Sequence, residues 1–88
     1  MNYEVIYTKK AVKSLRKIDK EQQKLIVSWI EKNLVDTEDP KTIGKPLKGT
    51  LNEFWRYRVG NYRILAEIND NELKIIVVNV GHRKDIYS

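Results

Sequence analysis

The sequence predicts an α+β fold in which a helical hairpin packs on a mostly antiparallel sheet of about four strands. Apolar residues recur at helical spacing over residues 11–34, and from residue 54 onward they alternate with a period of two. Short turns separate the last three expected strands, and strands joined in this way run antiparallel. The expected order is strand, helix, helix, strand, strand, strand. The helices should cover one face of the sheet and leave the other face open.

The first half of the chain supplies one strand and two helices. Residues 3–8 are rich in aromatic and β-branched side chains, which is typical of a strand, and Thr8 can cap the helix that follows. Asp19 is expected to begin the second helix, with Gln22 completing a capping box. The joint is short, so the helices should form an antiparallel hairpin. The two apolar stripes consist of Ala11, Leu15 and Ile18, and of Leu25, Ile26, Trp29, Ile30 and Leu34.

The second half opens with an irregular stretch over residues 36–52. This stretch contains prolines and glycines that interrupt regular structure, namely Pro40, Gly44, Pro46 and Gly49. Three strands are expected over residues 54–59, 62–68 and 73–80, with turns at residues 60–61 and 69–71. Gly81 should end the last strand, and residues 82–88 should form a short polar tail.

The composition excludes several classes of protein. A chain of 88 residues with 41% hydrophobic and 33% charged residues is expected to form one folded domain, residues 1–88. The absence of cysteine excludes disulfide scaffolds, thiolate zinc sites and cysteine nucleophiles, and a single histidine excludes a metal site with several histidines in one chain. The longest apolar run has four residues, and no signal-peptide pattern opens the chain. We therefore expect a cytoplasmic protein without membrane association.

The charge balance indicates an anionic partner. Lys and Arg number 17 against 12 acidic residues, which gives a net charge of +5. A basic surplus in a small domain favours nucleic acid or an acidic protein as partner, although solvated lysines explain the net charge alone equally well. Four of the five arginines lie in the last 33 residues. Arginine, with its planar fork of donors, is suited to binding phosphate.

The arginines are expected to share one face of the sheet. Alternation over residues 55–59 places Arg56 and Arg58 on one face, opposite Trp55, Tyr57 and Val59. Arg63 follows the next turn, and His82 and Arg83 follow the last strand. These five side chains are expected to form one basic patch that binds phosphate. The alternative is an ordinary solvated face with cross-strand ion pairs to acidic neighbours.

The chemistry open to such a patch is limited, and RNA cleavage fits it. The sequence contains no serine–histidine–acid set, no glycine-rich phosphate loop and no paired carboxylates placed for a metal. RNA carries its own nucleophile, the 2′-hydroxyl, so cleavage needs cations at the phosphate, a base and an acid. His82 is the candidate for proton transfer, and a histidine that merely caps a strand is the alternative. No cofactor or metal is expected.

At these residues the chain resembles the RelE family of bacterial toxin endoribonucleases, within the wider RelE/ParE superfamily. The similar segments are residues 45–49 (KPLKG), 55–63 (WRYRVGNYR) and 80–87 (VGHRKDIY). The resemblance implies a RelE-like fold, similar to that of microbial ribonucleases. It implies a messenger RNA interferase that cleaves in the ribosomal A site by metal-independent attack of the 2′-hydroxyl, which inhibits translation. It also implies a cognate antitoxin, RelB-like or of another family.

The resemblance assigns roles to individual residues. Arg56 and Arg58 match the basic pair that faces the scissile phosphate, and Arg63 matches the arginine that holds it. Arg83 matches an arginine near the leaving oxygen, and Tyr87 matches a tyrosine that orients or stacks on a codon base.

Two lysines are further candidates for RNA binding, and the strand pair differs from the pattern of the best-known family members. Lys45 and Lys48 lie in a loop that can follow backbone phosphates. The best-known members carry lysines in the strand pair, where one is thought to act as base, whereas this chain carries arginines, which do not deprotonate. His82 is therefore the candidate base, with Tyr87 second.

Two other functions remain open at this point. A ParE-like inhibitor of DNA gyrase would share the fold without nuclease activity, and the His82, Arg83 and Tyr87 set argues against it. The third hypothesis is a basic binding domain that derives from a toxin.

Overall fold

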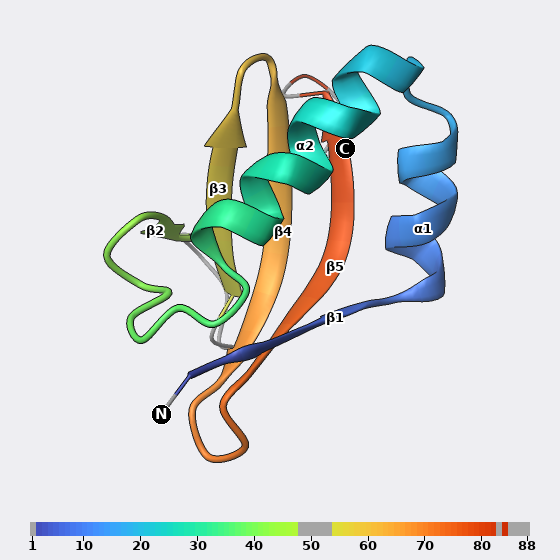
Figure 1. The fold of residues 1–88 in the computed structure, drawn as a ribbon. Helices are drawn as coiled ribbons and strands as arrows, with labels where there is room; N and C mark the ends of the chain where they lie inside the picture. Colours follow the sequence, from blue (N-terminus) through green and yellow to red (C-terminus); the bar gives the residue numbers. More distant parts are fainter. Residues whose placement is uncertain (1, 48–53, 83, 85–88) are drawn as a thin grey trace.

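The computed structural model describes residues 2–47, 54–82 and 84, and Figure 1 shows how the elements follow one another. The elements are β1 (Glu4–Tyr7), α1 (Lys9–Arg16), α2 (Lys20–Asn33), β2 (Lys45–Pro46), β3 (Phe54–Val59), β4 (Tyr62–Asn69) and β5 (Lys74–His82). The predicted order is confirmed, and one short strand, β2, is added to it. No helix in these ranges is long and apolar enough to cross a membrane.

The five strands form one sheet in the order β1-β5-β4-β3-β2. The β2–β3, β3–β4 and β4–β5 pairs are antiparallel, which confirms the mostly antiparallel sheet. At the β3–β4 turn Gly60 has a φ of 59°, a conformation that glycine adopts without strain. β1 runs parallel to β5, with Val5 opposite Ile75. Parallel neighbours need a long connection, and both helices and the other strands lie between these two in the chain.

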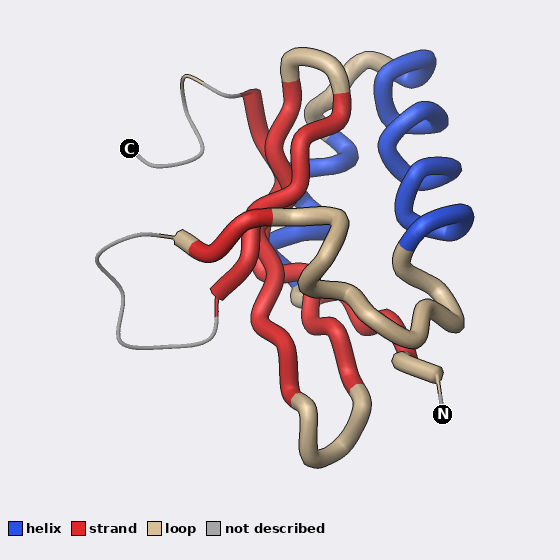
Figure 2. The backbone as a smooth tube through the Cα atoms, turned by 90° about the vertical axis from the view of Figure 1, so that its left-hand side faces the viewer, coloured by secondary structure: helices blue, strands red, loops and turns tan. Residues whose placement is uncertain are grey.

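Both helices lie on one face of the sheet, as Figure 2 shows, and no helix in the described residues covers the other face. α1 packs against β5, and α2 crosses over β3 and β4 (Figure 1). The rings of Trp29 and Tyr57 meet at 5.6 Å between centroids, which joins α2 to β3. The core between the layers contains Ala11 and Leu15 of α1, Ile26 and Ile30 of α2, and Tyr57, Ile64, Ala66, Ile68, Ile75, Val77 and Val80 of the sheet.

A β-bulge interrupts β5 and is held by α1. Leu65 pairs with Asn79 and Ala66 pairs with Val77, so Val78 is an extra residue on β5. The Thr8 hydroxyl donates to the Val78 carbonyl at 2.9 Å and also accepts from the backbone N–H of Ala11 at 3.1 Å. Thr8 therefore caps α1, as predicted, and fixes the bulge at the same time.

Ser14 gives the bulge a second contact from the middle of α1. Its hydroxyl lies 2.8 Å from Oδ1 of Asn79, which also accepts the backbone N–H of Val80 at 3.0 Å. The bulge is thus held by the N-cap residue of α1, Thr8, and by Ser14 within the helix.

Three local predictions were wrong. The Asp19 side chain makes no capping bond, and the Gln23 amide instead donates to the Ile18 carbonyl at 3.1 Å. Leu25 is 57% exposed, because the buried side of α2 runs through Ile26 and Ile30.

The third wrong prediction concerns the end of β5, where Gly81 was expected to end the strand. This strand continues through Gly81 to His82, because both residues still pair with β4. Two residues of the expected irregular stretch also form β2, where Pro46 is tolerated because an edge strand does not need every N–H in the ladder.

Candidate functional site

A cavity of about 330 Å³ lies beside β2, β3 and β4, on the face of the sheet that the helices leave open. Among the residues that the structure describes, seven line the cavity, of which four are cationic and none is acidic. The lining consists of Thr42, Ile43, Gly44, Lys45, Arg56, Arg58 and Arg63.

The four cations form two pairs of like charge across neighbouring strands. Lys45 stands directly opposite Arg56, and Arg58 stands directly opposite Arg63. Opposed residues have Cβ atoms roughly 5 Å apart, and like charges at this spacing destabilise a sheet. Within the part of the chain that the structure describes, none of Lys45, Arg56 and Arg58 forms an ion pair. Uncompensated positive charge gathered in a hollow is suited to a bound anion.

Arg63 is the buried member of the cationic group. Its side chain is 8% exposed, whereas Arg58 is exposed to solvent. One guanidinium nitrogen donates to the Tyr62 carbonyl at 3.4 Å. On β5 its cross-strand neighbour is Gly81, which carries no side chain. Arg63 thus contributes a buried cation to the lining of the cavity.

The loop that forms one wall of the cavity is bonded to β3. Tyr57 donates its hydroxyl to the Pro40 carbonyl at 2.6 Å, and the Trp55 indole donates to the Lys41 carbonyl at 3.2 Å. Burial, and secondly the charge of Asp39, raise the pKa of Tyr57 well above its ordinary value, so the phenol stays protonated and remains a donor. A Cβ on Gly44 would lie 2.6 Å from the Tyr57 ring, so only glycine lets the loop approach this closely.

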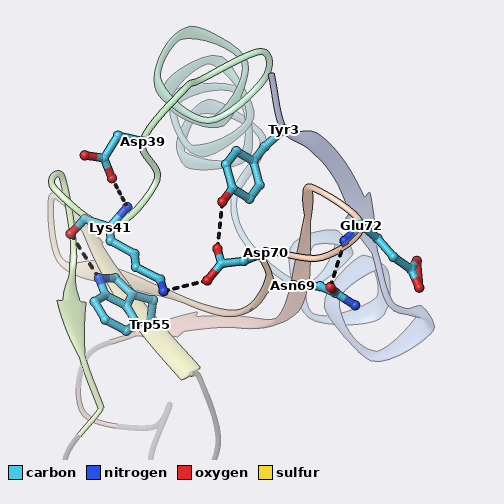
Figure 3. A network of polar contacts seen from close by, with 7 residues as sticks. All are labelled: Tyr3, Asp39, Lys41, Trp55, Asn69, Asp70 and Glu72. Carbon is cyan, nitrogen blue, oxygen red and sulfur yellow. Dashed lines mark hydrogen bonds and ion pairs between the residues drawn. The ribbon is translucent and has the colours of Figure 1, made fainter. Parts of the chain in front are cut away.

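A second set of contacts, centred on Asp70, holds the same loop from the β4–β5 turn (Figure 3). Asp70 accepts the Tyr3 hydroxyl at 2.6 Å and the Lys41 ammonium at 2.9 Å. Both bonds lower the pKa of Asp70, and the Lys41 bond has the larger effect. The Lys41 ammonium also lies 5.4 Å from the centroid of the Trp55 ring, within the range of a cation–π contact. We call this set, Tyr3, Lys41, Trp55 and Asp70, the Asp70 network.

His82 lies outside the cavity. It pairs with Tyr62 across the ladder, and the two rings meet edge to face at 5.7 Å. Cross-strand partners share a face, and Tyr62 pairs with Val59, which packs on the core beneath the helices. The backbone N–H of Lys84 donates to Nδ1 of His82 at 3.4 Å.

The β5 bulge explains this placement of His82. Strict alternation from Val77 would put residue 82 on the open face, but the extra residue at the bulge reverses the faces after it. Val77 and Val80, three residues apart, are therefore both buried beneath the helices.

The structure thus brings together four of the predicted site residues, Lys45, Arg56, Arg58 and Arg63. Lys48, Arg83 and Tyr87 lie outside the described residues. The cavity wall at residues 42–44 was not predicted from the sequence. The sequence feature that could have indicated it is Gly44, because a glycine inside a loop can mark a close approach of the backbone to its neighbours.

Comparisons of the sequence with known proteins agree with the resemblance. Residues 5–87 match the family described as the ParE toxin of the type II toxin–antitoxin system, parDE. Toxin RelG of Mycobacterium tuberculosis is 32% identical over 87 residues, which cover 99% of this chain and 98% of the relative. Toxin RelE3 of Methanocaldococcus jannaschii is 40% identical over 85 residues, which cover 94% and 93% of the two chains.

Solved structures show the same fold. The toxin–antitoxin complex RelBE2 from Mycobacterium tuberculosis contains a chain with a TM-score of 0.83 and 29% identity, over 97% of this chain and 95% of that one. The RelB–RelE complex from Methanococcus jannaschii gives 0.64 and 31%, over 93% and 94%. The chain therefore belongs to the ParE toxin family of the RelE/ParE superfamily and is the toxin of a type II toxin–antitoxin system.

Proposed function

We propose that this toxin is a ribosome-dependent messenger RNA endoribonuclease, which cleaves the message in the ribosomal A site and so inhibits translation. The observation that supports this most directly is the cavity, which two cross-strand pairs of like charge line and in whose described lining no carboxylate occurs. The backbone of a single RNA strand supplies phosphates, which suit such a cationic site.

The proposed reaction uses the RNA's own nucleophile and needs no further reactant. The 2′-oxygen attacks the adjacent phosphorus, the bond from phosphorus to the 5′-oxygen breaks, and a 2′,3′-cyclic phosphate and a 5′-hydroxyl result. Arg56 and Arg58 face the scissile phosphate and Arg63 holds it, so their charge meets the charge that grows at the pentacoordinate phosphorus. Lys45 and Lys48 bind neighbouring phosphates.

In this scheme, residues near the C-terminal end of the sequence transfer the protons. Arginine does not deprotonate, so the base lies outside the strand pair. We assign this role to His82 first and to Tyr87 second, with Tyr87 also stacking on a codon base and Arg83 acting at the leaving oxygen. The His82 ring contacts Tyr62 on the other face of the sheet, so proton transfer by His82 requires its ring to leave this position.

Primer extension on a translated message with purified ribosomes tests the proposal. We expect cuts between the second and third positions of codons, only during translation. Arg63→Ala should lower the cleavage rate about 10²–10³-fold, the usual cost of removing one donor aimed at developing charge. Arg58→Ala repeats the test at an exposed position where folding is not at risk, and Lys32→Ala on α2 is the matched control. Absence of cuts with the wild type, or an unchanged rate in both arginine variants, would contradict the proposal.

We also propose that a cognate antitoxin neutralises this toxin. The relatives from Mycobacterium tuberculosis and Methanococcus jannaschii were solved as complexes with antitoxins. An acidic segment of the antitoxin should cross the face that carries Arg56, Arg58 and Arg63. Arg58→Glu should then weaken the complex in a calorimetric titration, whereas unchanged affinity would place the contact elsewhere.

Inhibition of DNA gyrase is the second candidate, because the matching family is described as the ParE toxin. A gyrase inhibitor acts by protein contact and has no need of a cavity lined by cations. Supercoiling of plasmid DNA by purified gyrase separates the two functions. Inhibition of supercoiling by a toxin that leaves translated messages intact would favour gyrase.

A further inference from the structure

The net positive charge of the protein comes from one short segment that does not line the cavity. Residues 9–24 contain seven of the 17 basic residues and two of the 12 acidic ones, a surplus of five. The rest of the chain contains ten of each sign, so the net charge of +5 equals the surplus of this segment. All seven of these basic residues are exposed.

Five of the seven lie on one side of α1 and its C-terminal cap. At 3.6 residues per turn they fall within an arc of about 120°. Ala11 and Leu15, which are buried in the core, lie on the opposite side of the helix. We call this surface the α1 basic face, and it consists of Lys9, Lys10, Lys13, Arg16 and Lys17.

Two features of the α1 basic face are unfavourable for the helix that carries it. Lys9, Lys13 and Lys17 stand at successive spacings of four, where like charges repel. Lys9 and Lys10 occupy the first turn, where the helix dipole disfavours cations and which has no acidic residue, whereas the dipole favours Lys13 and Arg16 in the last turn. A merely solvated face normally mixes both signs and gains from opposite pairs at the same spacings. An anionic partner explains this arrangement, because it reverses each of these unfavourable terms.

The α1 basic face and the cavity lie on different parts of the molecule. α1 packs against β5 on the covered side of the sheet, and the cavity lies beside β2, β3 and β4 on the open side (Figures 1 and 2). A strand of RNA bound in the cavity therefore does not account for the α1 basic face.

We infer that the α1 basic face docks on the phosphate backbone of double-helical RNA. Four of its five cations are lysines, which bind phosphates as point charges without reading sequence. A membrane surface does not fit, because a membrane-bound helix inserts its apolar side and that side of α1 is buried in the core. The choice of RNA over DNA rests on the proposed function, since the ribosome presents folded RNA around the message.

Fluorescence anisotropy with a labelled 20-base-pair RNA duplex tests this inference on the whole purified toxin. The test variant carries Lys10→Gln, Lys13→Gln and Lys17→Gln. The control carries Lys24→Gln, Lys32→Gln and Lys74→Gln, which removes the same charge from other exposed or surface positions. Each phosphate contact adds about one to the slope of log affinity against log salt, so the test variant should lose about three and the control close to none. Replacing the same three α1 lysines by arginine should preserve binding.

The outcomes separate this inference from the proposed nuclease. Equal losses in the test variant and the control, or no loss in either, would overturn the α1 basic face as a docking surface, and messenger RNA cleavage by the wild type would be unaffected. Tighter binding to a DNA duplex of the same sequence, or to phosphatidylserine vesicles, would overturn RNA as its partner. Wild type that binds duplex RNA through α1 but cleaves no translated message would support the inference and contradict the nuclease.

Discussion

At the scale of single residues, the position of His82 makes its proposed role directly testable. The ring stands against Tyr62, with Nδ1 accepting the N–H of Lys84, on the face away from the arginines. If His82 takes the proton from the 2′-hydroxyl, His82→Gln should flatten the limb of the pH–rate profile that reports the general base, recorded over a range of about pH 5 to 8. Cleavage rates measured across this range give the answer. A His82→Gln protein with the wild-type profile, combined with a changed profile in Tyr87→Phe, would assign the base to Tyr87.

At the scale of elements, Thr8 connects α1 to the bulge in β5. Thr8→Ala removes the N-cap bond to Ala11 and the bond to the Val78 carbonyl. We expect a loss of about 1–2 kcal/mol in the free energy of unfolding, since caps of this kind contribute roughly that amount. Urea unfolding checks this, with Thr8→Ser as the control that keeps both bonds. Equal stability of the alanine and serine variants would contradict the account.

The Asp70 network predicts a dependence of loop docking on pH. Its bonds to Lys41 and Tyr3 hold the pKa of Asp70 below the ordinary value. The stabilisation is therefore complete above the unfolded pKa, about 3.9, and is lost as the pH falls through the lower folded pKa. Between pH 6 and pH 3 the urea midpoint of the wild type should fall more than that of Asp70→Asn. Parallel falls would mean that the network does not stabilise the folded state.

The sequence could predict the elements but not every pairing between them. Periodicity identified both helices and β3, β4 and β5, because burial of one side of an element produces a repeating apolar pattern, and aromatic and β-branched composition identified β1. β2 has two residues and no pattern, and it exists because Gly44 lets the loop reach Tyr57 and Arg56. The arginines of β3 were placed correctly since that strand alternates without interruption. The side of His82 could not be predicted, because it depends on a bulge fixed by Thr8 and Ser14 about 65–70 residues away in the chain.

At the scale of the whole molecule, the two basic surfaces should act independently. Salt should weaken the binding of a short single-stranded RNA in the cavity. A plot of log affinity against log salt concentration should fall with a slope of about 0.7 for each phosphate contacted. Arg58→Gln should lower that slope by about this amount, and Lys17→Gln on α1 should leave it unchanged. Anisotropy titrations at several salt concentrations provide the measurement. A smaller slope in Lys17→Gln would mean that single strands also reach α1.

The parallel pairing of β1 with β5 also determines when, during synthesis, the toxin can complete its fold. Residues 4–7 pair with residues 74–77, so the N-terminal strand finds its neighbour only after the ribosome has also synthesised the residues between the two strands. β4 likewise lacks one of its two partners until then. At roughly 5–20 residues per second, several seconds separate the synthesis of the two strands. During that interval Gly81 and the other β5 residues that flank Arg63 are absent, so a nascent chain does not present the finished cavity. The antitoxin that we propose as partner therefore has this interval in which to bind a new toxin molecule before its cavity is complete.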